Sequence, residues 1–139
     1  MKYEFIKIDN DNYKLKYKEK EFEFKKDVAL MNEFQGLNAK ARNKLIIDLA
    51  KEGLTTKDLT IKKEENGKIY YDNTNIKEME KNYLNMESLN MFDRITNKYF
   101  KMSLLELIDD IGINDENEVE EFSTKLIKVL TGKEENLPS

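Results

Sequence analysis

The chain of 139 residues contains neither histidine nor cysteine, and its single proline is the penultimate residue, Pro138. Histidine and cysteine supply most of the general acid–base groups, nucleophiles and transition-metal ligands that work at neutral pH. The five glycines are scattered, and no phosphate loop, dinucleotide fingerprint or nucleophile elbow is present. These absences predict a protein that binds another molecule without catalysing a reaction and that uses no cofactor or metal.

Other absences bear on the compartment. Without cysteine the chain forms no disulfide, so nothing indicates an oxidising environment. No apolar stretch approaches the roughly 18 residues of a membrane span. The first residues alternate between polar and apolar types, unlike a signal peptide. We therefore expect a cytoplasmic protein with no membrane partner.

Charged residues are abundant but balanced, since 24 basic and 28 acidic side chains give a net charge of −4. Proteins that bind nucleic acid usually carry a clear basic excess. Lys14, Lys16 and Lys18 do form a basic stripe with tyrosines between them. The alternation of a strand, however, places those tyrosines on the opposite face, where they fit a core. No nucleic-acid partner is expected.

The first 26 residues predict a three-stranded antiparallel meander. Apolar and charged residues alternate over residues 3–8, 13–17 and 22–25, and Asp and Asn form the turn between the first two segments. So small a sheet needs helices over its apolar face. The pattern predicts an α+β fold in which the meander packs on a helical body.

Apolar residues at helical spacing follow the meander. Four helices are predicted, over residues 27–53, 75–99, 103–112 and 115–132. Asp27 is the expected N-cap of the first helix, and Gly36 weakens that helix. A small second hairpin is predicted over residues 60–71, where Asn66 and Gly67 form a strong turn pair. The whole predicts a single domain over 1–132 and a flexible tail over 133–139.

Two acidic segments raise the question of a cation site. Asp9–Asn12 begins like a calcium loop. That pattern then requires Asp or Asn, Gly and finally Glu, whereas this chain has Tyr13, Lys14 and Lys20 at those positions. The seven acidic residues from Asp109 to Glu121 suit a loop and a helix N-terminus, where negative charge is favourable. We interpret the first segment as a turn and the second as structural, with a weak divalent-cation site or docking of a basic partner as the alternatives for the second.

Two apolar stripes are candidate partner-binding surfaces. Met86 and Met91 lie on the long helix, and methionine side chains adapt to varied partners, although they also fill gaps in ordinary cores. Phe122, Leu126 and Leu130 share one face of the last helix. Packing of that face within its own domain and contact with a second subunit or client are both open at this point.

Four segments carry a family resemblance. FEFKKDVALM at 22–31 leads into EFQGL at 33–37, a long acidic–basic helix follows, and IYYDN at 69–73 and LTGK at 130–133 come after it. In this order of segments the chain resembles the tail assembly chaperones of bacteriophages and prophages of low-GC Gram-positive bacteria. The resemblance covers residues 1 to about 132.

The resemblance implies a non-enzymatic protein that coats the long, helical tape-measure protein, or another tail protein, while the tail is assembled in the host cytoplasm. Reversible binding of an amphipathic helix agrees with that role, and homo-oligomerisation would add avidity. Two alternatives stand beside it: a structural tail-completion or connector subunit, and a regulatory protein-binding adaptor.

Overall fold

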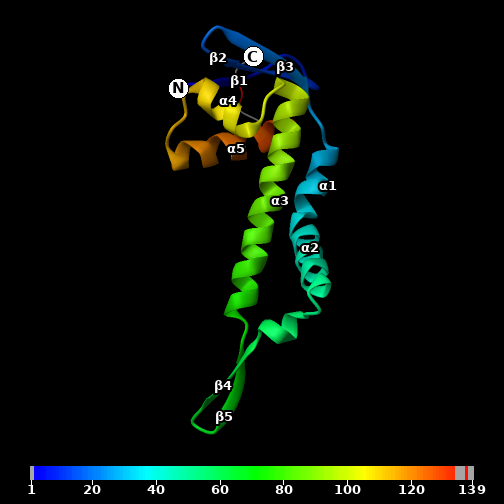
Figure 1. Cartoon of the computed structure of the whole chain (residues 1–139). Coiled ribbons are helices and arrows are strands. Elements are labelled where there is room, and N and C mark those ends of the chain that lie inside the picture. The colour runs from blue at the N-terminus through cyan, green and yellow to red at the C-terminus, as the bar shows by residue number, and fades with distance from the viewer. Residues whose placement is uncertain (1, 134–136, 138–139) are drawn as a thin grey trace. The chain divides into compact units, whose positions relative to one another are not determined.

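The computed structural model describes residues 2–133 and 137 (Figure 1). The elements are β1 (Glu4–Lys7), β2 (Asn12–Tyr17), β3 (Lys20–Lys25), α1 (Ala29–Gln35), α2 (Leu37–Lys51), the 3-10 helix η1 (Thr56–Leu59), β4 (Ile61–Glu65), β5 (Lys68–Asp72), α3 (Thr74–Phe100), α4 (Leu104–Ile111) and α5 (Glu116–Leu130). The predicted α+β fold, with its N-terminal meander and second hairpin, is confirmed.

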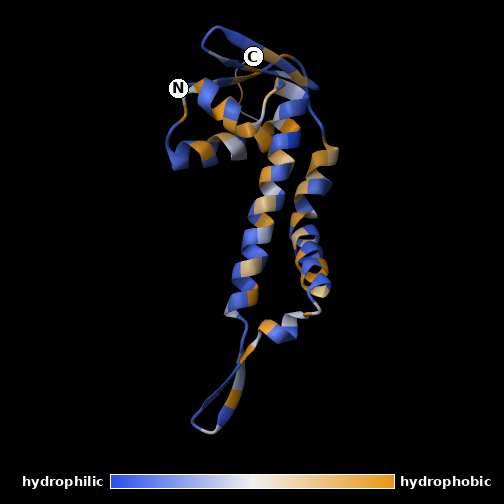
Figure 2. Cartoon of the chain, viewed as in Figure 1, coloured by the Kyte–Doolittle hydropathy of each residue, from blue (hydrophilic) through white to orange (hydrophobic). Residues whose placement is uncertain are grey.

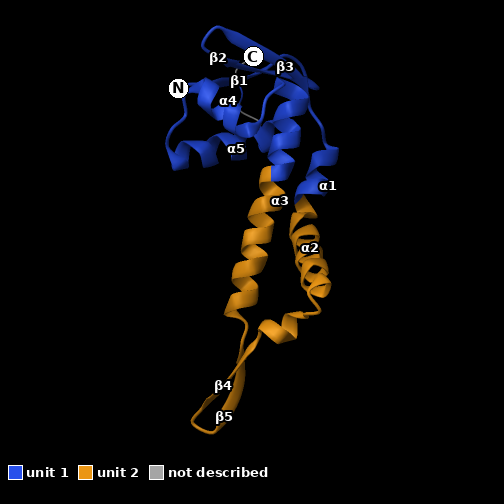
Figure 3. Ribbon diagram, in the orientation of Figure 1, with its two compact units in different colours: residues 1–34, 90–139 blue, residues 35–89 orange. Residues whose placement is uncertain are grey.

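The chain divides into two compact units (Figure 3). Unit 1 consists of residues 1–34 and 90–139, and unit 2 of residues 35–89. Helix α3 contributes its first part to unit 2 and its last part to unit 1. The prediction of one domain over 1–132 did not include this division. Of the tail predicted over 133–139, residues 134–136 and 138–139 lie outside the described residues.

The meander of unit 1 has strand order β1-β2-β3 and one buried face. Its register places Leu15 between Phe5 and Phe22, and Tyr13 beside Phe24. The opposite face carries cross-strand pairs of lysine and glutamate, as alternation along a strand requires. The buried face is therefore aromatic and the other face charged, as predicted.

Helices α3, α4 and α5 provide the rest of the unit 1 core. The Phe100 ring meets those of Phe22 and Phe24 at centroid distances of 5.8 and 5.5 Å. On α5, Phe122 meets Tyr3 at 5.0 Å and Phe5 at 5.9 Å. These contacts cover the aromatic face of the sheet with helices, which a three-stranded sheet needs to be stable.

Caps set the ends of the last two helices. The Ser103 hydroxyl accepts a hydrogen bond from the Glu106 amide at 3.2 Å, and the Asp115 carboxylate accepts one from the Asn117 amide at 2.9 Å. Gly112 ends α4 in the left-handed conformation, with φ of +93°. The predicted starts of these helices are confirmed, since Ser, Asp and Gly at these positions satisfy free backbone groups.

The first predicted helix differs from expectation. It is two helices, α1 and α2, divided at Gly36. Asp27 is not an N-cap through its side chain: its carboxylate accepts a hydrogen bond from the Tyr99 hydroxyl at 3.1 Å and lies 3.8 Å from Lys98. Its amide donates to the Leu130 carbonyl at 2.7 Å. The Asp27 side chain therefore contacts residues distant in sequence and does not cap the helix that follows it.

Unit 2 contains α2, η1, the β4–β5 hairpin and the first part of α3. Asn66 and Gly67 both have positive φ, 53° and 77°, which is the geometry of the predicted two-residue turn. The buried residues of α2 recur every four positions: Leu37, Ala41, Leu45 and Leu49. In the described residues of both units, no helix is long and apolar enough to cross a membrane.

Candidate protein-binding surface

The structure corrects four of the five candidate partner-binding residues. Phe122, Leu126 and Leu130 have no exposed side-chain surface, and Met91 is 1% exposed. The apolar face of α5 is consumed by the core of unit 1, which includes Tyr3 and Phe5. Of the two interpretations of this helix, packing within its own unit is the one observed, so these four residues offer no surface to a partner.

Met86 differs from the other four. It lies on the part of α3 that belongs to unit 2, and 61% of it is exposed. Leu89, three residues further on the same helix, is 56% exposed. Side chains three residues apart in a helix are neighbours on its surface. The exposed apolar pair of Met86 and Leu89 is therefore what remains of the predicted methionine surface.

Unit 2 carries most of the exposed apolar side chains in the described part of the chain. They belong to α2, α3 and the hairpin: Ile46, Ile47, Ile61, Ile69, Tyr70, Tyr71, Met86 and Leu89. Figure 2 shows apolar and polar residues mixed along these elements. Single exposed apolar residues are ordinary, but eight of them among 55 residues make unit 2 the candidate binding region. Of these residues, only Met86 was predicted from the sequence. Periodicity identifies the apolar face of a helix, but it does not say whether that face is buried or exposed.

Polar contacts join α2 to α3 within unit 2. Glu87 is 3% exposed and lies against Lys40, at 3.4 Å, and Lys44, with which it forms a close ion pair. The Tyr83 hydroxyl donates to the Asp48 carboxylate at 2.6 Å. Because residue numbers fall on α3 as they rise on α2, the two helices run antiparallel. These polar contacts stand beside the buried apolar stripe of α2.

The charges of this helix pair shift its ionisation. Hydrogen bonds from Lys44 and Lys40 hold the pKa of the Glu87 carboxyl below its usual range, against the opposing effect of burial. The hydrogen bond to Asp48 raises the pKa of the Tyr83 phenol. At neutral pH Glu87 is therefore ionised between two lysines, and Tyr83 is neutral, so both groups serve as structural contacts between α2 and α3.

The hairpin is exposed along both strands. Four of its apolar side chains are between 45% and 67% exposed, and three of these, Ile69, Tyr70 and Tyr71, are consecutive in β5. An isolated two-stranded hairpin is marginal in water. A salt bridge of 2.9 Å between Lys63 and Asp72 ties the strands, and the Asp72 carboxylate also accepts from the Thr74 amide at 2.9 Å. These bonds, from Thr74 and Lys63, lower the pKa of Asp72.

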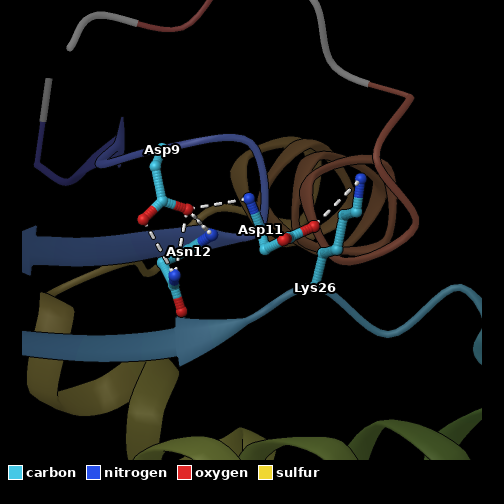
Figure 4. Close-up of polar contacts among 4 residues, drawn as sticks. All are labelled: Asp9, Asp11, Asn12 and Lys26. Carbon is cyan, nitrogen blue, oxygen red and sulfur yellow. Dashed lines mark hydrogen bonds and ion pairs between the residues drawn. The ribbon is translucent and has the colours of Figure 1, made fainter.

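The acidic turn at Asp9–Asn12 is the predicted turn between β1 and β2 (Figure 4). One Asp9 carboxylate oxygen accepts hydrogen bonds from the amides of Asp11 and Asn12, at 2.8 and 2.9 Å, and both oxygens accept from the Asn12 side chain. Asp11 lies 3.7 Å from Lys26. The carboxylates are thus used within the turn, as its sequence predicts.

In the acidic run from Asp109 to Glu121, Asp110 has structural partners in the meander. Asp110 accepts hydrogen bonds from the Tyr17 hydroxyl and from Lys20, each at 2.6 Å, and these contacts hold α4 to the meander. Lys20 and then Tyr17 hold the pKa of Asp110 below its usual range. Over residues 2–133, no three His, Cys, Asp or Glu side chains are grouped as metal ligands would be.

The basic stripe of β2 is also placed as predicted. Tyr13 and Tyr17 are 4% and 2% exposed, on the core face. Lys14 and Lys16 lie on the other face, 3.5 and 3.8 Å from Glu21. The rings and the ammonium groups do not share a surface, so the arrangement does not offer stacking beside phosphate contacts.

Comparisons with known proteins give no match. No protein-family model matches the chain, and no curated protein or solved structure was found to be similar to it. The features of the chain that indicate a function are the exposed apolar side chains of unit 2 and the order of segments in the sequence.

Proposed function

We propose that this protein is a non-enzymatic phage tail assembly chaperone. In this proposal it acts in the cytoplasm of the host cell and binds the tape-measure protein, or another tail protein, before the tail is complete. The observation that carries the proposal is the concentration of exposed apolar side chains in unit 2.

The chemistry of unit 2 fits a client that is a long amphipathic helix. Exposed apolar residues such as Ile47, Met86 and Leu89 supply contact area, and methionine adapts its shape to different partner residues. Lysines at positions 40 and 44, each about half exposed, provide a charged border. Helical clients are commonly held by such apolar surfaces with charged edges.

The contrast with unit 1 supports the same assignment. Unit 1 has a closed core of aromatic and aliphatic side chains, and its last helix is fully used in that core. Unit 2 buries one apolar stripe of α2, and polar contacts between Lys44 and Glu87 and between Asp48 and Tyr83 add to this packing. Eight large apolar side chains of unit 2 nevertheless stay exposed, which suits the weak, reversible binding of a protein that is later displaced from its client.

Co-expression with the long helical product of the neighbouring gene tests the proposal. We expect the two proteins to co-elute in size-exclusion chromatography with light scattering, and the client to be soluble only in their joint presence. A structural tail subunit would instead be found at fixed copy number in mature particles. A client that aggregates beside this protein would contradict the chaperone assignment and favour a regulatory adaptor.

Matched variants locate the binding surface. Met86→Asp places a charge on the 61% exposed position of unit 2, and Leu105→Asp places one on the 69% exposed position of α4 in unit 1. Both positions are on helices and outside the core, so both variants should give wild-type circular dichroism. Client binding should fall at least tenfold for Met86→Asp only. Equal loss in both variants, or in neither, would refute the assignment to unit 2.

A further inference from the structure

The outer edge of β5 is an unpaired strand edge. Among the described residues, β5 pairs with β4 alone, and this two-stranded sheet has no third strand. A strand edge presents a row of backbone donors and acceptors that other strands can join. Proline, bulges and charged side chains protect such edges, whereas β5 has no proline, pairs with β4 without a bulge, and carries three consecutive apolar residues between Lys68 and Asp72.

The register of the hairpin decides which residues face that edge. Glu65 and Lys68 close the two-residue turn, and the pair that closes such a turn exchanges backbone hydrogen bonds. Hydrogen-bonded and non-hydrogen-bonded pairs then alternate. The backbone groups of Tyr70 and Asp72 therefore point to β4, whereas those of Ile69 and Tyr71 point to the free edge.

The sequence of β5 is complementary to itself about Tyr70. When two copies of β5 run antiparallel around a two-fold axis at Tyr70, Lys68 of each copy lies opposite Asp72 of the other. Ile69 of each copy then lies opposite Tyr71 of the other, and the two Tyr70 residues face each other. The register thus gives two pairs of opposite charge on one face and two apolar pairs on the other.

We propose that the β5 edge is a self-association site, at which two copies of this chain pair antiparallel about Tyr70 to form a four-stranded sheet. The hydrogen bonds come from Ile69 and Tyr71, whose backbone groups face outward. Tyr70 falls at a non-hydrogen-bonded position, where opposing side chains are closest. A two-fold contact of this kind uses the same residues from both copies and therefore closes at two.

The edge of β4 does not offer the same match. A two-fold axis at Lys63 would place Lys62 opposite Glu64, but it would also place two lysines opposite each other and Ile61 opposite Glu65. An axis at Glu64 would place two glutamates opposite each other. Like charges directly across strands are destabilising, and neither register pairs apolar residues. The observations therefore select β5 over β4 for a second copy.

Five residues per copy form a small contact. Stable interfaces bury about 1,200–2,000 Å² in total, and one strand edge with its side chains falls below that range. We expect a dimer that dissociates on dilution and whose population rises with protein concentration. This expectation is independent of the proposed tail client, because no client residue takes part.

Single cysteines test the register, because the chain contains no cysteine of its own. In the proposed dimer the two Tyr70 Cα atoms lie about 4.5 Å apart, within the span that a disulfide bridges. Lys63 is directly opposite Tyr70 within the hairpin, so the two Lys63 Cα atoms would lie roughly 14 Å apart, three strand spacings. With oxidised glutathione as oxidant, Tyr70→Cys should form a covalent dimer at least tenfold faster than Lys63→Cys.

Proline variants test the same edge without new cross-links. Glu64 and Ile69 face each other in the hairpin, and the backbone N–H of each points away from the partner strand. Ile69→Pro should increase the dimer dissociation constant at least tenfold in sedimentation equilibrium, and Glu64→Pro should leave it unchanged. Circular dichroism of both variants checks that the chain is folded.

Three results would overturn the proposal. Faster cross-linking of Lys63→Cys than of Tyr70→Cys would place the contact at β4. Greater loss of association in Glu64→Pro than in Ile69→Pro would do the same. A wild-type chain that stays monomeric at millimolar concentration, with no cross-linking of Tyr70→Cys, would show that β5 does not pair with itself. None of these results depends on the chaperone proposal.

Discussion

Replacement of Phe122 by alanine should strongly destabilise unit 1. The Phe122 side chain is completely buried, and its ring meets those of Tyr3 and Phe5 at 5.0 and 5.9 Å. Truncation of a buried phenylalanine costs about 3–5 kcal/mol, from lost transfer free energy and from the cavity that remains. Since two aromatic contacts are lost as well, we expect about 4 kcal/mol.

That loss is large beside the total stability of a small domain, about 5–15 kcal/mol. In a domain of 60–100 residues, each kcal/mol shifts Tm by about 4–8 °C, so Phe122→Ala should lower Tm by roughly 16–32 °C. Differential scanning calorimetry of the full chain measures the shift. Near-ultraviolet circular dichroism, which reports on the packed aromatic rings of unit 1, should follow the same transition.

Leu105→Ala is the matched control, because Leu105 is an apolar helix residue that is 69% exposed. It should change the free energy of unfolding by about 0.5 kcal/mol or less. The reasoning is refuted if Phe122→Ala leaves Tm within a few degrees of wild type while abolishing association with another protein. That outcome would mean that α5 packs against a partner and not in the core of unit 1.

Three further measurements check individual contacts. Burial, followed by the hydrogen bond to Asp27, raises the pKa of Tyr99 to about 12, so ultraviolet titration should show a phenol ionising there that Tyr99→Phe removes. The folded pKa lies above the unfolded value of about 10, so the stability from this group is lost as pH rises above about 10. The pKa of Asp110 is lowered, so its contribution to the free energy of unfolding is present above about pH 4 and is lost as pH falls through the folded pKa. Asp110→Asn should therefore reduce the loss of stability at acid pH that urea titrations measure. Gly112→Ala should cost about 1–2 kcal/mol in chemical denaturation, because φ is +93° and no atom lies within 4 Å of the added Cβ to clash or to pack; an unchanged midpoint would contradict that account.

Local chemistry made much of this fold predictable. Alternation fixed the faces of the meander, and the positive φ angles of Asn66 and Gly67 are what that residue pair favours in a two-residue turn. Ser103 and Asp115 cap their helices as their positions predict. Each of these features depends on residues only a few positions apart.

Features set by distant residues were not predictable from one sequence. Asp27 resembles an N-cap, but its carboxylate bonds to Tyr99, 72 positions away. Phe122 and Met86 both lie on amphipathic stripes, yet one is buried and the other 61% exposed. Periodicity identifies an apolar face without saying what covers it, and the division of the chain into two units depends on that covering.

The discontinuity of unit 1 along the chain has a consequence for synthesis. The meander is synthesised before unit 2, but Phe100 and Phe122, which cover its aromatic face, follow only after all 55 residues of unit 2. At translation rates of about 5–20 residues per second, roughly 5–20 s pass between synthesis of the meander and synthesis of α5. In nascent chains stalled before Phe122, Tyr3 and Phe5 would therefore be exposed. Unit 2 is continuous in sequence, so its synthesis is complete before that of unit 1.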